Sequence, residues 1–186
     1  MSRVLFIRHA ETEMAGRFCG HSDPELNGQG QAQLAQLSEI LSTEKIREIY
    51  SSDLRRAQST AEAIAAGRNI PLTLSPALRE IHFGAWEGMS WQEIEQKDPG
   101  FAQRWVDGYP NVPAPAGESF QRFEARVLDQ VRQLIDRDVE GIVVVTHAGV
   151  LRVVLTHLHG CSEQEAWQQT QPYCCIVRYE AKGENK

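Results

Sequence analysis

The chain has 186 residues, 41% of them hydrophobic and 24% charged, which is the balance of a globular protein with a sizeable core and favours a single domain. Its formal net charge of −6 argues against bulk electrostatic binding to nucleic acid or to an anionic membrane, but a local site could still hold a small anion. The sequence has no bilayer-length apolar run, no signal-peptide pattern and no Cys-x-x-Cys pair among its four cysteines, which predicts a cytoplasmic protein with reduced thiols.

The first half of the chain alternates short apolar runs with helical patterns. The first run, Val4 to Ile7, predicts a strand buried on both faces that stops at Arg8 and His9. The further elements expected are a helix over residues 27–41 capped by Asn27, a strand over 46–52, a helix from a Ser52 or Asp53 cap to about Ala66, and a strand over 72–74. Such βα units predict a mostly parallel sheet.

Residues 77–116 are the least regular part of the sequence. They hold three of the four tryptophans, Trp86, Trp91 and Trp105, and they end in a proline-rich stretch that cannot lie inside a regular element. We expect a helical insertion at about 85–116 over the carboxyl edge of the sheet, as a lid or a pocket wall. The alternative is an ordinary helical hairpin whose tryptophans belong to the core.

The second half begins with an amphipathic pattern over residues 119–136, which predicts a long helix. The later elements expected are a strand over 142–146, a helix over 150–158, a final strand over 174–179 and a disordered tail over 181–186. Together the elements predict an α/β fold, a three-layer sandwich with a mostly parallel central sheet and helices on both faces.

Two of the predicted strands end in the same way, at His9 and at His147. Because the carboxyl ends of parallel strands meet at one edge of a sheet, we expect both histidines at that edge, beside Arg8. The backbone amides of Ala148 and Gly149 begin the next helix and would point at a bound anion.

Two further side chains can reach the same edge. Arg56 lies one turn into the helix after the second strand, and Glu80 starts the insertion. Arg55 lies about 100° around the helix axis from Arg56, and we therefore expect it in solvent. Guanidinium groups fit phosphate oxygens, and a neutral histidine can act as a nucleophile, so the pattern indicates a site for phosphate chemistry.

Five motifs in series resemble those of the histidine phosphatase superfamily, the group that also contains cofactor-dependent phosphoglycerate mutase. The matching segments are Arg-His-Ala-Glu-Thr at 8–12, Ser-Asp-Leu-Arg-Arg-Ala at 52–57, Leu78 to Gly88, Gly-Glu-Ser at 117–119 and Thr-His-Ala-Gly at 146–149. They span residues 4 to about 155. The resemblance implies a phosphoglycerate mutase-like fold and one histidine phosphatase domain over residues 1–186.

The resemblance also implies a role for each residue at the predicted edge. His9 would be the nucleophile that takes the phosphoryl group, Glu80 would be the proton donor, and Arg8, Arg56 and His147 would hold the non-bridging oxygens. Two guanidinium groups and a histidine can balance the charge of a phosphomonoester, about −1.5 to −2, so no metal and no other cofactor is implied.

The chain departs from the family pattern at two places near the predicted phosphate site. Ala10 stands where glycine is usual, and the asparagine often found near Ala15 is missing. Two alternatives are open: the chain lacks this phosphate contact, or the contact comes from Arg17, from Cys19 or from the backbone amide of Gly20. The remaining histidines match no catalytic position and are expected to be structural or solvated: His21, His82, His157 and His159.

The substrate class implied is a small phosphorylated metabolite. Mutases of the family are typically longer, so the compact chain favours hydrolysis, and residues 79–88 with the later tryptophans look most like the α-ribazole phosphatase branch, which acts in assembly of the cobalamin nucleotide loop. The chain could also be a broad-specificity phosphatase or a phosphoglycerate mutase, and a non-catalytic phosphate-binding regulator is the hypothesis from a different functional class. The sequence leaves both a monomer and a homodimer open.

Overall fold

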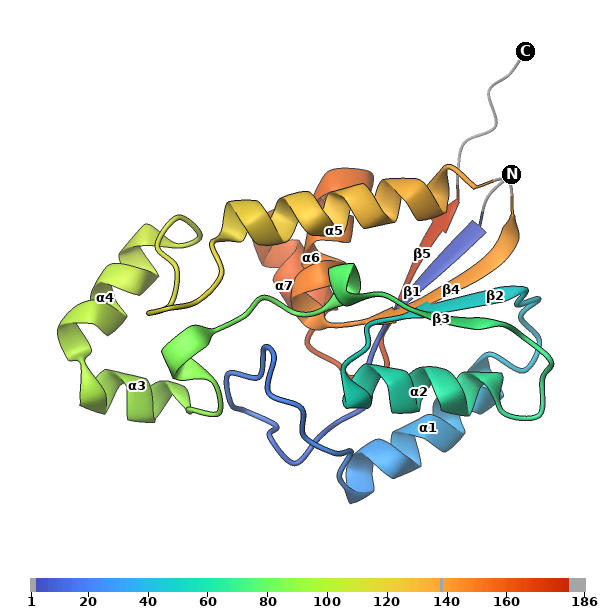
Figure 1. The fold of residues 1–186 in the computed structure, drawn as a ribbon, viewed down its shortest axis with the longest axis horizontal. Coiled ribbons are helices and arrows are strands. Elements are labelled where there is room, and N and C mark those ends of the chain that lie inside the picture. Colours follow the sequence, from blue (N-terminus) through green and yellow to red (C-terminus); the bar gives the residue numbers. More distant parts are fainter. Residues whose placement is uncertain (1–2, 138, 181–186) are drawn as a thin grey trace, which may run out of the picture.

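A five-stranded sheet forms the middle layer of the computed structural model, which describes residues 3–137 and 139–180 (Figure 1). The strands lie in the order β3-β2-β4-β1-β5. Their bounds are Arg3–Arg8 for β1, Glu48–Ser51 for β2, Leu72–Leu74 for β3, Glu140–Thr146 for β4 and Ile176–Glu180 for β5. Within this sheet β5 pairs antiparallel with β1 and the other pairs are parallel, which confirms the mostly parallel sheet.

Helices cover both faces of the sheet, as the three-layer prediction requires (Figure 1). Alternate residues of β1 face opposite layers: Leu5 and Ile7 pack with one set of helices, and Val4 and Phe6 pack with the other. The first set is α1 (Gly28–Ile40) and α2 (Arg55–Ala65), and the second is α5 (Phe120–Ile135), α6 (Ala148–His159) and α7 (Glu163–Gln169). The two cores are thus separated by the sheet itself.

The caps of the first two helices differ in how well the sequence predicted them. Asn27 caps α1 as expected, since its side chain accepts a hydrogen bond from the amide of Gly30. The prediction for α2 is wrong, because neither Ser52 nor Asp53 caps it. Instead Asp23, from a distant loop, accepts a hydrogen bond of 2.7 Å from the amide of Arg55.

The segment after β3 leaves the sheet and forms two short helices, α3 (Trp91–Lys97) and α4 (Pro99–Gly108), at one end of the molecule (Figure 1). Its apolar side chains form a third, smaller core in which Trp86 is buried. Trp91 and Trp105 pack against that core and also line the main cavity. The tryptophans therefore divide between the two roles considered for them.

One helix was missed by sequence reasoning. The helix α7 has only seven residues and buries only Ala166, so it carries no apolar repeat that could have been recognised. Its start is nevertheless marked by a capping box between Ser162 and Glu165. In the described part of the chain, no helix is both long and apolar enough to cross a membrane. The tail predicted at 181–186 lies outside the described residues.

Candidate active site

The two histidines of the predicted site come together at the ends of neighbouring parallel strands. Arg8 on β1 pairs in register with Thr146 on β4, and the amide of His9 donates to the carbonyl of Thr146 at 2.9 Å. The rings of His9 and His147 lie 5.1 Å apart, centroid to centroid. The expected juxtaposition at the carboxyl edge is therefore present.

His9 is held in one tautomer. Its Nδ1 lies 2.7 Å from the carbonyl oxygen of Ala10, and because a carbonyl can only accept, Nδ1 carries the proton. The other ring nitrogen, Nε2, accepts a hydrogen bond of 3.2 Å from Nε of Arg56. Burial, reinforced by the charges of Arg56 and Arg8, holds the pKa of His9 well below its ordinary value. The ring is thus neutral at pH 7, and the electron pair of Nε2 is directed at Nε of Arg56.

Arg56 is fixed by its surroundings although it is almost completely buried. Its terminal nitrogens donate to the backbone carbonyls of Cys19, Gly20 and Ser22 at 3.2, 2.7 and 2.6 Å. These three partners are neutral. Among the described residues, no carboxylate lies within ion-pair distance of the Arg56 guanidinium, so its positive charge beside His9 is not neutralised. Such a charge favours a bound anion. Arg55, in contrast, lies on the surface with Glu25, as predicted.

His147 has one ring nitrogen in a hydrogen bond and, among the described residues, one without a partner. Its Nε2 lies 2.8 Å from Oγ of Ser52, a hydroxyl that also accepts a hydrogen bond from the amide of Leu54. That hydroxyl can donate its proton to Nε2 or accept one from it, so this contact is compatible with either tautomer of His147. Nδ1 is buried and has no partner among the described residues. Burial and then the charge of Arg56 lower the pKa of His147 well below its ordinary value.

Arg8 lines the cavity from the other side. Its guanidinium lies 3.9 Å over the ring of Tyr173 and donates to the carbonyl of Thr170 at 2.9 Å and to the carbonyl of Gln171. Sequence reasoning missed Tyr173, which lies in the turn before β5 and whose ring is also 5.8 Å from that of His9. The aromatic face orients a guanidinium that has no acidic partner among the described residues.

Glu80 lines the cavity and is buried, with 8% of its surface exposed. Its Oε1 accepts from the amide of Ile81 and its Oε2 from the amide of Gly149, both at 2.9 Å. The amide of Gly149 was expected to face a bound anion, and that expectation is wrong because the carboxylate occupies it. Ala148, the other residue predicted at this helix start, lines the cavity.

Gly20 does not offer its amide to a phosphate, contrary to one of the three expectations for this loop. The amide donates to Oε2 of Glu87 at 3.1 Å instead. Of the other two candidates, Arg17 lines the cavity but is paired with Glu93 at 2.8 Å. Cys19 also lines the cavity, and burial raises the pKa of its thiol to about 11, so it is a neutral thiol rather than a thiolate.

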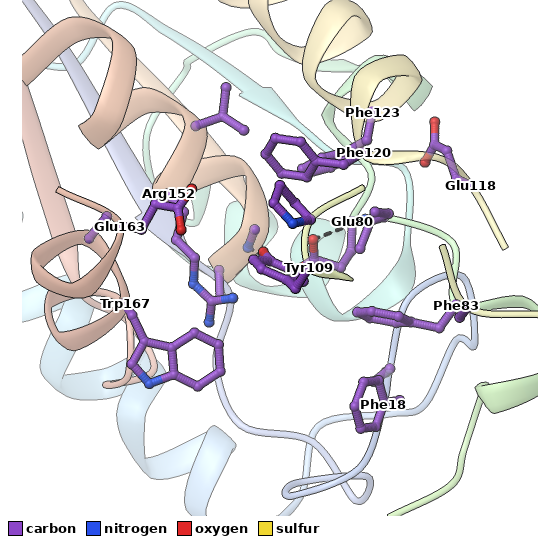
Figure 2. A pocket seen from close by; sticks show the side chains of 18 of the residues that line it. Phe18, Glu80, Phe83, Tyr109, Glu118, Phe120, Phe123, Arg152, Glu163 and Trp167 are labelled. Carbon is purple, nitrogen blue, oxygen red and sulfur yellow. Dashed lines mark hydrogen bonds between the residues drawn. The ribbon is translucent and has the colours of Figure 1, made fainter. Parts of the chain in front are cut away.

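The site opens into a cavity of about 1060 Å³ with an aromatic wall. Figure 2 shows Glu80 and Tyr109 near its centre, with Phe18 and Phe83 on one side and Arg152 with Trp167 on the other. Arg152 stacks 3.9 Å over Trp167, and its Nε donates to Oγ1 of Thr170 at 3.1 Å.

Arg152 is a cavity cation that sequence reasoning missed. No carboxylate lies within ion-pair distance of it in the described part of the chain, and burial lowers its pKa. Its position, one turn after Gly149 on α6, was the signal that could have indicated it, because residues three apart lie on one face of a helix.

Of the other four histidines, two line the cavity, His82 and His157. His21 and His82 pack ring to ring, 4.8 Å between centroids, and His157 pairs with Glu124. His159 packs against Tyr179 near β5. Across residues 3–137 and 139–180, no group of three or more histidine, cysteine, aspartate or glutamate side chains could hold a metal ion.

Comparisons with known proteins agree with this geometry. A model of the histidine phosphatase superfamily (branch 1) matches residues 4–186. The chain is 30% identical to the adenosylcobalamin/α-ribazole phosphatase of Escherichia coli K12 over 168 residues, covering 89% of this chain and 83% of that protein. It is 34% identical to phosphoserine phosphatase 1 of Hydrogenobacter thermophilus over 172 residues, covering 90% and 81%.

The solved structures include the α-ribazole phosphatase from Shigella flexneri. That structure superposes with a TM-score of 0.88 at 28% sequence identity and covers 97% of this chain and 91% of its own. The family model matches nearly the whole chain, the fold is the expected phosphoglycerate mutase-like one, and two histidines meet at the strand ends. The chain therefore belongs to the histidine phosphatase superfamily, branch 1.

Proposed function

We propose that the protein hydrolyses phosphomonoesters without a metal, through a phosphohistidine formed on His9. The observation that carries the proposal is the environment of that ring. Nδ1 is pinned by the carbonyl of Ala10, Nε2 is held by Arg56, and burial keeps the ring neutral. A neutral imidazole with one fixed tautomer is a competent nucleophile toward phosphorus.

The chemistry takes two steps that share one carboxyl group. In the first, Arg56 transfers its hydrogen bond from Nε2 of His9 to an oxygen of the bound phosphate, which frees the electron pair of Nε2. Nε2 then attacks phosphorus, the ester P–O bond breaks, and the protonated carboxyl of Glu80 gives its proton to the leaving alkoxide. In the second, water attacks the phosphohistidine, the P–N bond breaks, and Glu80 accepts the proton from that water. Inorganic phosphate leaves, and both residues return to their starting states.

Positioning and charge supply the remainder of the rate, as in other phosphoryl transfers. Arg8, Arg56 and His147 would hold the three non-bridging oxygens, and the amide of Ala148 at the start of α6 would add to them. The unpartnered Nδ1 of His147 supports this assignment, because as an N–H donor it would find in a phosphate oxygen the partner that the described residues do not supply.

The substrate we propose is α-ribazole 5′-phosphate, whose leaving group carries a planar aromatic base. Two observations support it: the name of the Escherichia coli relative, and an aromatic wall that includes Trp91, Trp105, Tyr109 and Phe120 in a cavity of about 1060 Å³. The segment at about 85–116 would then act as the wall of a single domain that covers the leaving group. The four free thiols support a reducing, cytoplasmic setting.

A second candidate is a phosphorylated hydroxy acid such as phosphoserine. The observation that favours it is Arg152, a partly buried residue with no acidic partner among the described residues, whose guanidinium could receive a carboxylate beside the phosphoryl group. The Hydrogenobacter thermophilus relative is named for that activity. Broad-specificity hydrolysis and the mutase reaction use the same phosphate site and differ from both candidates in their substrates.

A substrate panel separates these activities. We expect kcat/KM for α-ribazole 5′-phosphate to exceed that for p-nitrophenyl phosphate, phosphoserine and 3-phosphoglycerate by more than about tenfold, because the aromatic wall contributes remote binding energy. Chelator should leave the rates unchanged. Preferred hydrolysis of phosphoserine that is lost selectively in Arg152→Gln would favour the second candidate. Equal rates on all substrates would indicate a broad-specificity phosphatase. Exchange of phosphate between positions of glycerate would indicate a mutase. A rate lost in chelator and restored by magnesium would contradict the metal-independent mechanism.

A further inference from the structure

Glu87 is a partly buried carboxylate that the proposed mechanism does not use. It collects five hydrogen bonds, all from neutral donors. Oε1 accepts from the amides of His21 and Phe83, both at 2.9 Å, and Oε2 accepts from the amides of Gly20 and Ser22 and from the hydroxyl of Ser22, at 3.1, 2.9 and 2.6 Å. Burial opposes its ionisation, but these hydrogen bonds hold the pKa of Glu87 below its ordinary value. The group is therefore an anion held by the loop at residues 20–22 and by the amide of Phe83.

The opposite side of that loop holds Arg56. The peptide group between Cys19 and Gly20 donates its N–H to Glu87 and gives its carbonyl to Arg56. The next peptide group, between Gly20 and His21, does the same, with distances of 2.9 Å on the acidic side and 2.7 Å on the basic side. Two consecutive peptide groups are thus aligned between a carboxylate and a guanidinium.

We propose that Glu87 is the positioning residue for Arg56, acting through these two peptide groups as the anionic end of a peptide-bridged ion pair. Each bridging peptide has its dipole oriented by both charges, so the hydrogen bonds on the two sides strengthen one another. Arg56 in turn reaches Nε2 of His9. The proposal rests on the proposed function only in that His9 is taken as the nucleophile.

Gly20 has a packing reason to be glycine in this arrangement. A Cβ there would lie 2.2 Å from the carbonyl oxygen of Ile81 and 2.4 Å from Oε1 of Glu87, distances that real Cβ atoms do not show. Only a residue without a side chain lets the loop approach the carboxylate this closely. The loop is therefore built around Glu87 on one side and Arg56 on the other.

The test is a double-mutant cycle with p-nitrophenyl phosphate, an ester whose leaving group needs no proton from Glu80. We expect Glu87→Gln to lower kcat/KM at least about tenfold in the otherwise unchanged protein and less than about twofold when Arg56→Ala is already present. If Glu87→Gln does not fold, Ser22→Ala, which removes the hydroxyl donor to Glu87, replaces it in the same cycle, with a smaller loss but the same non-additivity. Equal losses in the two backgrounds, or no loss in either, would overturn the proposal.

The pH profile gives a readout that a merely structural defect would not move. Arg56 helps to lower the pKa of His9, so a displaced Arg56 should shift the acid limb of kcat/KM in Glu87→Gln upward, toward the ordinary value of an imidazole. An unmoved limb would overturn the proposal.

The matched control is Glu44→Gln, which removes a partly buried carboxylate paired with Arg3 and Arg178 far from the site; it should leave the rate and the acid limb unchanged. The same shift in Glu44→Gln would also overturn the role of Glu87. If the proposed function itself fails, the unsubstituted protein will form no phosphohistidine; if only the role of Glu87 fails, that intermediate will still form.

Discussion

Acidification from about pH 7.5 to about pH 5.5 should destabilise the protein through His9 and His147. Both rings are almost completely buried, and burial, assisted by Arg56, keeps their pKa values well below 6.5. In the unfolded chain each histidine titrates near pH 6.5, so below that pH the unfolded state binds more protons than the folded state. Stability is therefore complete above about pH 6.5 and falls as the pH drops toward the folded-state pKa.

The size of the effect follows from this difference in proton binding. For a histidine that stays neutral when folded, the two-unit change in pH lowers the free energy of unfolding by about 1.4 kcal/mol, and two such residues give about 2.7 kcal/mol. Urea unfolding at the two pH values should show that loss for the unsubstituted protein. In His147→Gln the loss should be smaller by about 1.4 kcal/mol, because the substitution's own effect cancels between the two pH values. An identical pH dependence in both proteins would refute the claim that His147 is buried as a neutral ring.

Four substitutions test the assignments in the site. Arg56→Ala should lower kcat at least about a hundredfold, the loss typical of one preorganised charge-stabilising contact. Arg55→Ala should change kcat by less than about twofold, because the Arg55 side chain is 63% exposed. Equal losses of kcat in steady-state assays would show that the orientation assigned to the two arginines on α2 is wrong. Gly149→Ala should lower kcat for alkyl phosphates, because a Cβ would lie 2.1 Å from Oε1 of Glu80 and displace it; an unchanged kcat would mean that this carboxylate need not occupy its observed place. Glu80→Gln should reduce the rate for alkyl phosphates more than for p-nitrophenyl phosphate, since nitrophenolate leaves without a proton, and equal reductions would contradict its role as the acid.

The sequence predicted the meeting of His9 and His147 because a simple rule connects strand ends in a parallel sheet. Each residue directly follows an apolar run that could be read as a strand, and the register of β1 on β4 then brings them together. Arg56 followed from helix phase in the same way. These predictions depend on local periodicity, which can be recognised from the sequence alone.

What the sequence could not predict depends on contacts between distant segments. The cap of α2 comes from Asp23, and the carboxylate that orders the Gly20 loop comes from Glu87, neither of which is near its partner in the chain. Arg152 and Tyr173 reach the cavity from α6 and from the turn before β5. No pattern within one segment indicates such contacts, because tertiary packing decides them.

The most direct test of the proposed mechanism is rapid-quench trapping of the covalent intermediate. The protein would be mixed with a phosphomonoester labelled with ³²P, stopped within one turnover in alkaline denaturant, which preserves phosphohistidine, and the labelled peptide mapped by mass spectrometry. We predict one phosphoryl group on His9 that forms and decays at rates consistent with kcat, and no labelled peptide from His9→Ala. Label on another residue, or steady turnover with no trapped label in the unsubstituted protein, would contradict the account.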